Sequence, residues 1–448
     1  MRKSNSVTIS SLAVAVVAAL ACGQAMASGF QIREDSIDAM SRSHAGSASD
    51  WGDAAVVANN PAAMSLFDKN TFQTDLTAID LHGQFSGAGE DLLGNPLTGG
   101  NGGDLGDTTP VPAFDVIFPF GNGFTLGASV TAPFGLKTQY DPDWIGRYEA
   151  IKSELKTVDL TFAGSYKFND MFSAGLSIIS QRADAELSNA VDFGTLLYVN
   201  GGGPLGFTPQ SADGFARIKG NDTSWGWDVG FLFRPTPNTN IGLNYRSKID
   251  HDINGHADFD VPSNVQAVLA LNPATASLFQ NTGANASIST PSVVTLSLSQ
   301  KLSSTFTISA DIERTNWGVL KNLVVNFDNP AQPPSVEVFD WKDSTEFAIG
   351  ADWQFDPHWV LRAGYAHDET PTSNATRDPR LPDNNRNLYS LGLGWMPNDN
   401  VEWNIGFSHI AIDKPSIFNI NLNNGSVLAG TYTNADANLY GVSATFHF

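Results

Sequence analysis

The chain has 448 residues, with 25 Lys and Arg side chains against 46 Asp and Glu, 41 Gly and a single Cys. This acidic balance argues against a nucleic-acid partner, because phosphate contacts need clustered Lys and Arg side chains. No apolar run reaches the roughly 18–20 residues that a membrane helix needs. A helical membrane protein is therefore excluded, whereas membrane strands that alternate apolar and polar residues are not.

The first 27 residues have the pattern of an export signal. Arg2 and Lys3 are followed by an apolar stretch over 12–21 and by Ala25-Met26-Ala27, a small-x-small cleavage site. We expect residues 1–27 to be a signal peptide and the mature chain to begin at Ser28. Cys22 is a poor lipoprotein site, because Ala19 stands where Leu is preferred. Cleavage after Ala27 would remove Cys22 and leave the mature chain without cysteine, which excludes disulfides and thiol chemistry.

The next segment, residues 28–68, lacks strand periodicity and is rich in small residues such as Ala45, Gly46 and Ala48. It is too long and too apolar for a disordered tail. Small residues would let short helices pack closely inside a barrel lumen, so the segment is interpreted as a plug, or hatch. The alternative is a periplasmic extension.

From residue 69 onward the chain alternates apolar and polar side chains, with a period of two that places them on opposite faces of a strand. The pattern is clear at the C-terminus, where Tyr440, Val442 and Phe446 share a face. Aromatic residues gather at the segment ends, as they do at membrane interfaces. The expected strands cover 71–86, 110–120, 123–134, 155–168, 171–186, 223–234, 239–251, 290–301, 304–315, 343–355, 358–369, 386–396, 400–412 and 437–448.

These fourteen segments are joined alternately by short turns, such as 121–123 and 397–399, and by long polar loops, such as 187–222 and 252–289. This layout predicts an all-β fold, a 14-stranded antiparallel transmembrane β-barrel over 69–448 in the outer membrane of a Gram-negative bacterium. Closing an even number of strands removes the sheet edges. The terminal Phe448 is interpreted as a signal for the outer-membrane assembly machinery, with a buried last strand as the alternative.

Three motifs carry a family resemblance: Ser28-Gly29-Phe30-Gln31-Ile32, the triplet Asn60-Pro61-Ala62 before the first strand, and Pro133-Phe134-Gly135-Leu136 followed by Trp144-Ile145-Gly146-Arg147-Tyr148. With these motifs the chain resembles the FadL family of outer-membrane transporters for long-chain fatty acids and hydrocarbons. The resemblance runs from Ser28 to Phe448 and is weaker in the loops beyond about residue 190.

The resemblance implies a fourteen-stranded barrel closed by an N-terminal hatch. It implies that an apolar ligand lands on an extracellular groove, enters a pocket beside the hatch and leaves sideways at a kink in strand 3. In this sequence Phe30 and Ile32 would line the pocket. Asn60, Pro61 and Ala62 would hold the hatch against the wall.

The kink would comprise Pro133, Phe134 and Gly135. Pro133 has no N–H to donate to a strand ladder, and Gly135 relaxes the backbone limits beside it. A broken ladder at membrane depth is tolerated only where it lines a cavity. The alternative is that Pro133 merely ends the strand.

Side-chain parity makes Arg246, Lys248 and Arg362 inward-facing and therefore possible partners for a ligand carboxylate. The same parity turns a larger set of acids inward: Asp115, Asp159, Asp228, Asp311, Glu313, Glu346, Asp352 and Glu402. The three bases could equally pair with these acids, so neutral hydrocarbons compete with long-chain fatty acids as the ligand.

The sequence gives little support for catalysis. His409 and His447 lack a distinctive nearby Ser motif, so we expect no enzyme, no catalytic residues, no metal and no cofactor. The expected partners are a hydrophobic small molecule, outer-membrane lipid and lipopolysaccharide, and the chain is expected to be a monomer. A non-specific porin and an adhesin-like structural barrel remain as alternatives to passive uptake.

Overall fold

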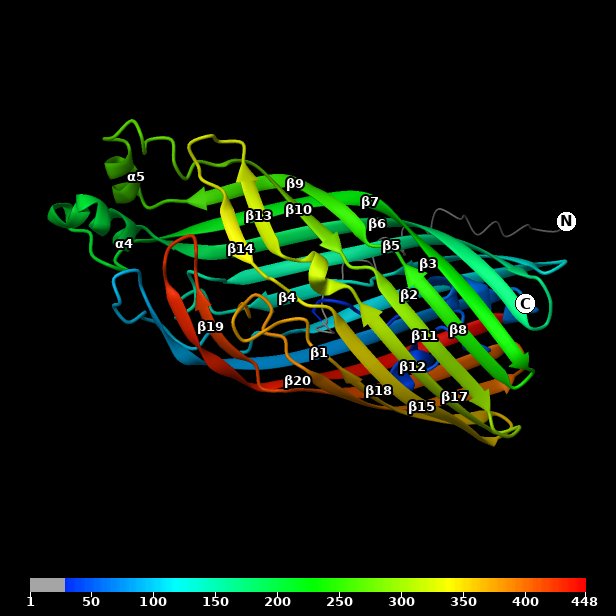
Figure 1. The fold of residues 1–448 in the computed structure, drawn as a ribbon. Helices are drawn as coiled ribbons and strands as arrows, with labels where there is room; N and C mark the ends of the chain where they lie inside the picture. The colour runs from blue at the N-terminus through cyan, green and yellow to red at the C-terminus, as the bar shows by residue number, and fades with distance from the viewer. Residues whose placement is uncertain (1–28) are drawn as a thin grey trace, which may run out of the picture.

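The computed structural model of the chain describes residues 29–448, so the expected signal peptide and Cys22 lie outside the described residues. Long antiparallel strands form one sheet that closes on itself (Figure 1). The strand segments are β1 (Thr71–Glu90), β2 (Thr108–Gly121), β3 (Phe124–Thr131), β4 (Gly135–Gln139), β5 (Lys152–Lys167), β6 (Phe172–Asp192), β7 (Asp213–Thr236), β8 (Thr239–Arg246), β9 (Ile249–Asp260), β10 (Thr282–Thr290), β11 (Val293–Lys301), β12 (Phe306–Thr315), β13 (Asn322–Phe327), β14 (Ser335–Val338), β15 (Ser344–Asp356), β16 (Trp359–Asp368), β17 (Arg386–Asn398), β18 (Val401–Ile412), β19 (Ser416–Ile420) and β20 (Val427–His447).

These segments make fourteen barrel strands, because six strands are each interrupted once. The interrupted strands are β3 with β4, β8 with β9, β10 with β11, β12 with β13, β14 with β15, and β18 with β19. Consecutive strands pair antiparallel around the ring. β20 closes it by pairing with β1 from Thr71↔His447 to Glu90↔Val427. The predicted fourteen-stranded antiparallel barrel is confirmed.

The strands extend further outward than the alternation indicated. The stretch 187–222, expected to be a loop, contains the end of β6, the start of β7 and between them α4 (Phe193–Leu197), η2 (Tyr198–Gly202) and η3 (Gly203–Leu205). The stretch 252–289 contains the end of β9, α5 (Ser263–Leu269) and the start of β10. These strand extensions lie beyond the apolar band, so both of their faces carry polar residues. The period of two is therefore not visible in their sequence.

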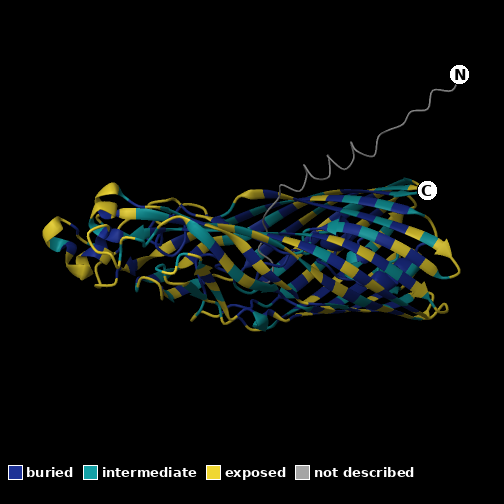
Figure 2. Cartoon of the chain, turned by 90° about the horizontal axis from the view of Figure 1, so that it is seen from above, coloured by how far each residue is buried: buried dark blue, intermediate teal, exposed yellow. Residues whose placement is uncertain are grey.

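The outer wall carries exposed apolar side chains in strict alternation with buried ones, which gives the checkerboard in Figure 2. On β7, Trp225, Trp227 and Phe231 are exposed, whereas Asp228, which lies between Trp227 and Phe231, and Leu232, which follows Phe231, are buried. An apolar outer face and a polar inner face define a barrel that faces lipid. Among residues 29–448, no helix is long and apolar enough to cross a membrane.

Residues 29–68, called the N-terminal segment below, lie against the inner wall of the barrel. They contain α2 (Ile37–Ser41), α3 (Val56–Asn59) and η1 (Pro61–Leu66). Helix α2 contacts β16, β17, β18 and β20, and η1 contacts β3, β5, β6 and β7, so the segment reaches opposite sides of the ring. Most of its apolar side chains are fully buried.

The segment is joined to the wall by hydrogen bonds and ion pairs. The Gly46 amide donates to Asp311 Oδ1 on β12 at 2.7 Å, and the Ile37 amide donates to Asp75 Oδ1 on β1 at 2.8 Å. The Arg33 guanidinium pairs with Glu313 and Glu346. Buried amides satisfied by carboxylates fix the segment in one position, because leaving such groups unpaired is costly.

Glycines of the inner wall make room for this segment. A Cβ added at Gly230 would lie 1.9 Å from Asn60 Oδ1, and one at Gly364 would lie 2.0 Å from the Arg42 carbonyl carbon. Similar close approaches occur at Gly127, Gly175, Gly242, Gly350, Gly392, Gly406 and Gly441. Part of the high glycine content of this sequence is thus explained by the close packing of the N-terminal segment on the backbone of the inner wall.

Candidate functional site

The third barrel strand is interrupted between β3 and β4. Thr131 pairs with Asp159 of β5, and Gly135 pairs with Lys156. Four steps along this strand therefore match three steps along β5. On the other side β2 pairs with β3 only as far as Phe114↔Val130, and β4 pairs with β5 alone. The ladder between the second and third strands therefore ends at Val130, beside the expected kink at Pro133, Phe134 and Gly135.

The start of the N-terminal segment occupies this interruption from the inside. The Ile32 amide donates to the Pro133 oxygen at 2.8 Å, and the Gly135 amide donates to the Phe30 oxygen at 2.8 Å. Gln31 and Phe134 form an isolated antiparallel bridge between these two bonds. Backbone groups that the missing partner strand would have satisfied are therefore paired with residues 30–32.

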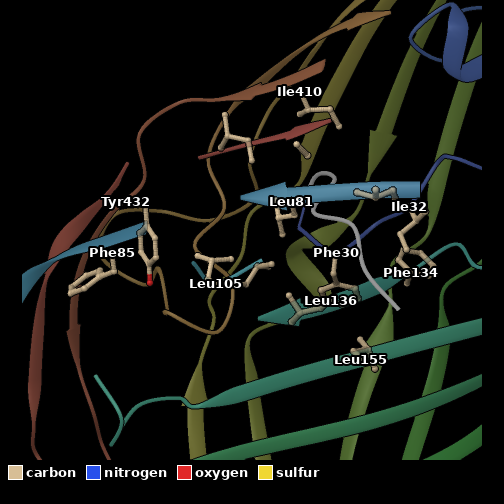
Figure 3. Close-up of a cluster of buried hydrophobic side chains, with 14 of the residues drawn as sticks. Phe30, Ile32, Leu81, Phe85, Leu105, Phe134, Leu136, Leu155, Ile410 and Tyr432 are labelled. Carbon is tan, nitrogen blue, oxygen red and sulfur yellow. The ribbon is translucent and has the colours of Figure 1, made fainter. Parts of the chain in front are cut away.

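An apolar cavity of about 880 Å³ of empty space lies on the extracellular side of Phe30. Phe30, Leu136 and Leu155 form one side of it and point toward one another in Figure 3. The remaining apolar lining comes from Ala185, Leu187, Ile218, Ile253, Ala284, Ala286, Ile288, Leu323, Val325, Phe339, Trp341 and Leu381. A largely apolar cavity with few polar groups is typical of a small-molecule site.

Aromatic rings fix the position of Phe30 at the edge of this cavity. Its ring centroid lies 4.6 Å from that of Trp317 and 5.6 Å from that of Trp341, with tilted or edge-on geometry. Gly29 has a φ of +63°, and a Cβ there would lie 2.8 Å from the Trp341 ring. Glycine at position 29 lets the chain turn tightly so that Phe30 can enter the cluster.

A second cavity, of about 700 Å³ of empty space, lies between the N-terminal segment and the interrupted strand. Ile32, Pro133 and Phe134 contribute to its lining. Its charged lining residues are Arg33, Asp35, Arg246 and Glu313, two of each sign. Phe30 and Ile32 were predicted to line one pocket. In the structure Phe30 lines the apolar cavity and Ile32 lines the second cavity, on either side of the segment that crosses the interruption.

A buried base on the wall of the apolar cavity, Arg380, was not among the predicted ones. Arg380 lines the cavity from the loop 369–385, which folds into the barrel mouth. Arg380 is 6% exposed. Its guanidinium donates to Ser153 Oγ at 3.1 Å and to the backbone carbonyl oxygen of Glu149 at 2.5 Å. The nearest oxygen of its ion-pair partner, Glu337, is 3.8 Å away. This loop has no periodicity, so parity reasoning could not place Arg380.

Two acids lie near Arg380: Glu149, buried in the loop between β4 and β5, and Glu337, half-buried on β14. Burial, followed by the nearby Asp378 and Glu337 carboxylates, raises the pKa of Glu149 to about 8. Burial raises the pKa of Glu337 to about 7, although the Arg380 guanidinium acts in the opposite direction. These raised pKa values leave both carboxyls partly protonated near neutral pH, so the positive charge of Arg380 is incompletely neutralised.

The three bases predicted from parity have separate environments. Arg362 is buried and donates to Asp38 of the N-terminal segment and to Glu402 of β18, so it joins the segment to the wall. Arg246 donates to Asp159 Oδ2 at 2.5 Å, and its guanidinium lies 5.9 Å from the Phe134 ring centroid. Both lie on the inner side, as predicted.

The inward placement predicted for Lys248 is wrong. Its side chain is 53% exposed and pairs with Asp250, which hydrogen-bonds the outward Ser289. Buried positions shift from Asn244 to Ser247, Ile249 and His251 across the break between β8 and β9. One extra residue at such a break reverses the faces of everything that follows it.

The Asn60-Pro61-Ala62 triplet caps the turn that begins η1. Asn60 Oδ1 accepts from the Ala62 amide at 3.1 Å. Its Nδ2 donates to the Ala48 oxygen at 2.7 Å and to the Phe231 oxygen of β7 at 3.2 Å. One buried amide side chain thus connects two parts of the N-terminal segment to the barrel wall.

Within residues 29–448, no group of three or more His, Cys, Asp or Glu side chains is arranged to hold a metal ion. The described chain therefore offers cavities, a gap in a strand ladder and an inserted segment as its distinctive features. These features belong to the class of transmembrane β-barrel transport proteins.

The chain belongs to the family of outer membrane transport proteins OMPP1/FadL/TodX, whose model matches residues 18–448. It is 28% identical over 415 residues to the long-chain fatty acid transport protein of Escherichia coli O6:H1, covering 90% of this chain and 91% of that one. Among solved structures, a FadL homologue of Pseudomonas aeruginosa superimposes with a TM-score of 0.87 at 26% identity, covering 94% of this chain and 100% of that one.

The toluene transporter TbuX of Ralstonia pickettii superimposes with a TM-score of 0.65 at 18% identity, over 93% of this chain and 99% of that one, which shows the shared fold. The family and its members place the chain in the outer membrane of a Gram-negative bacterium as a transport protein, as the sequence predicted.

Proposed function

We propose that the chain is a passive uptake channel for hydrophobic molecules, most of all long-chain fatty acids, gated by the N-terminal segment acting as a hatch. The observation that carries this proposal is the double position of Phe30. Its ring lines the apolar cavity, while its backbone oxygen accepts the Gly135 amide at the interruption. A ligand that displaced the ring would also disturb the pairing that fills the gap.

The proposed hatch comprises residues 28–68 and the barrel 69–448. Burial of the segment, its contacts with opposite sides of the ring and the glycines that receive it support this division. Asn60, Pro61 and Ala62 would anchor the rear of the hatch to β7 while its front, at Phe30 and Ile32, moves. A segment that fills part of the lumen and contacts opposite sides of the ring favours a gated channel over a non-specific porin, whose lumen is an open aqueous channel.

The proposed route starts between the outermost loops. Helices α4 and α5 pack through an apolar cluster that includes Phe193, Leu197 and Val265. Nearby Leu196 and Tyr198 are left exposed. An apolar chain landing there would pass to the apolar cavity, then to the second cavity, and would leave sideways between β2 and β4, where no strand ladder blocks it.

Arg380 is the proposed partner for a fatty-acid carboxylate in the apolar cavity. It lines the cavity, and its ion-pair partner Glu337 lies 3.8 Å away with a pKa raised to about 7. Arg–carboxylate contacts are strong when desolvated. Arg246 is a candidate only for the second cavity, since its Nη2 already donates to Asp159. The otherwise apolar lining also suits neutral aromatic hydrocarbons, which would not need Arg380.

A binding experiment separates these ligands. Purified protein would be titrated with a labelled long-chain fatty acid, with toluene as competitor, for the natural chain, Arg380→Gln and the control Lys248→Gln. A fatty-acid channel binds tightly, is not displaced by toluene and loses roughly tenfold or more in affinity in Arg380→Gln alone. Displacement by toluene with equal affinity in all three chains would assign the cavity to neutral hydrocarbons.

We further propose that a single chain suffices, since cavity, gap and hatch all lie within one barrel. The C-terminal Phe448 is 69% exposed, and its amide donates to the Asn70 oxygen at 2.9 Å. An exposed terminal aromatic side chain on a paired strand is available to the assembly machinery before the ring closes. Deleting Phe448 should lower the amount of assembled barrel without changing ligand affinity in the barrels that do assemble.

A further inference from the structure

Basic side chains gather on one part of the outer wall. Lys137, Lys152, Lys156, Arg182, Arg217 and Lys219, called the basic surface below, lie on β4, β5, β6 and β7. They are six of the 23 bases that follow residue 27 in a chain of strongly negative net charge. Among the described residues of β16, β17, β18 and β20, the Arg side chains are buried and none faces outward. The basic surface is therefore local to one side.

Strand register brings these residues into adjacent rows. Lys137 pairs with Glu154, Glu154 with Glu186, and Glu186 with Lys219, which forms one row across four strands. Lys156 pairs with Asp184 in the next row, and Arg217 pairs with Ser188 in the row beyond Glu186. Alternate residues of a strand share a face, so all of these side chains emerge on the outer side of the wall.

The basic surface begins where the apolar outer band ends. Leu160, Ile178 and Trp225 are 41%, 54% and 68% exposed, and Leu160 and Trp225 both pair with Ser180 of β6. Arg182 follows Ser180 by two residues, about 7 Å further along the strand. A large exposed Trp at the end of an apolar band marks the membrane interface. The bases therefore stand at the height of the outer-leaflet headgroups.

The six bases pair with five carboxylates, those of Asp107, Glu154, Asp184, Glu186 and Asp258, so the bases exceed the acids by one. Lys152 contacts Glu154 at 2.6 Å and Glu186 at 2.9 Å, whereas Lys156 shares Glu154 and Lys219 shares Glu186. Three lysines thus share two carboxylates. Exposed ion pairs of this kind contribute little to stability and exchange readily, so the acids hold the lysines near one another without removing their capacity to bind an anion.

We propose that the basic surface binds the phosphorylated headgroup of lipopolysaccharide, with its acyl chains lying on the apolar band below. Phosphate oxygens suit clustered Lys and Arg side chains. Leu176 and Ile178, directly under Arg182, offer exposed aliphatic surface to the acyl chains. The bases of β5, β6 and β7 occupy the outward-facing positions of their strands, and of the six bases only Lys219 also belongs to the lining of the apolar cavity.

The test compares two variants of equal charge. Lys152→Gln/Lys156→Gln/Lys219→Gln removes three lysines of the basic surface, and Lys248→Gln/Lys321→Gln/Lys414→Gln removes three exposed lysines elsewhere. Each folded barrel in phosphatidylethanolamine nanodiscs would be titrated with fluorescent lipopolysaccharide. The proposal predicts saturable binding that is weakened about tenfold or more in the first variant and within about twofold of the natural chain in the second.

Two further arms decide the chemistry. Lipopolysaccharide stripped of its phosphates should bind as weakly to the natural chain as intact lipopolysaccharide binds to the first triple variant. Phosphatidylglycerol should compete poorly, because it has a single phosphate and fewer acyl chains than lipopolysaccharide. Equal binding by both triple variants, or equally good competition by phosphatidylglycerol, would overturn the proposal. If the first triple variant fails to fold, the single change Arg182→Gln provides the same comparison.

Discussion

The backbone oxygen of Phe30 accepts a hydrogen bond from the Gly135 amide at 2.8 Å, so the third residue of the expected mature chain completes a strand ladder that the barrel itself leaves open. The Phe30 ring at the same time contacts Trp317 and lines the apolar cavity. Residues more than a hundred positions apart in sequence thus join the interior of the cavity to the gap in the wall.

Asn60→Ala should loosen the hatch without unfolding the barrel. The change removes the bonds from Asn60 to the Ala48 and Phe231 oxygens and the cap on the Ala62 amide, a loss of about 1–3 kcal/mol at a buried site. The N-terminal segment should then exchange its amide hydrogens faster. Asn221→Ala, on the outward side of β7, is the control and should change nothing. Unaltered exchange in Asn60→Ala would show that the triplet does not anchor the segment.

Gly230→Ala should displace the same anchor by steric conflict. The added Cβ would lie 1.9 Å from Asn60 Oδ1, and the Asn60 side chain is held there by its bonds to the Ala48 and Phe231 oxygens. Gly164→Ala is a matched control, because its nearest neighbour would be the Leu126 Cδ2 atom at 3.6 Å, an ordinary contact. In planar bilayers the first variant should conduct ions measurably and the second should remain closed. Equal conductance in both would contradict the idea that the wall glycines seat the hatch.

Removing one residue from 132–134 should close the lateral gap. The strand has four residues where β5 has three, so deletion of Pro133 restores equal register between Thr131 and Gly135. The ladder to β2 could then continue past Val130. Fatty-acid binding to the purified protein should persist within a few-fold, while uptake into cells falls to the level of cells that lack the protein. Normal uptake by this variant would rule out an exit at the interruption.

The packing of the extracellular loops should weaken as the pH rises. The pKa of Glu149 is raised from 4.5 to about 8 and that of Glu337 from 4.5 to about 7. Between the unfolded pKa of 4.5 and these raised pKa values, the folded loops bind more protons than the unfolded ones. The free energy of unfolding therefore falls with increasing pH. Amide protection in 369–385, corrected for intrinsic rates, should be lower at pH 8 than at pH 5. Glu149→Gln should flatten this dependence, and protection that rises with pH would contradict it.

The barrel could be predicted from sequence because its signal is local. Alternation in segments such as Trp225 to Phe233 reports which face meets lipid, and the fourteen strands follow from counting such segments. The interruption at Pro133 could also be foreseen, because proline removes a ladder donor. Motifs around Phe30 and Asn60 pointed to the N-terminal segment through a family resemblance rather than through periodicity.

The polar parts of the site could not be predicted in the same way. The break before Ser247 shifts the parity of the following residues, so Lys248 faces outward although simple alternation turns it inward. Arg380 comes from the aperiodic loop 369–385 and Trp341 from the break between β14 and β15, and only tertiary contacts bring them to the cavity. The wall glycines carry no signal until the segment that they receive is in place.

The central claim, that residues 30–32 must leave the interruption for a ligand to pass, can be tested by a reversible lock. The described chain has no cysteine, and Gln31 and Phe134 face each other in an antiparallel bridge, a spacing that suits a disulfide. In Gln31→Cys/Phe134→Cys, oxidation should abolish fatty-acid uptake and a reductant should restore it, while each single variant takes up fatty acid under both conditions. Undiminished uptake by the verified, fully oxidised double variant would contradict the account.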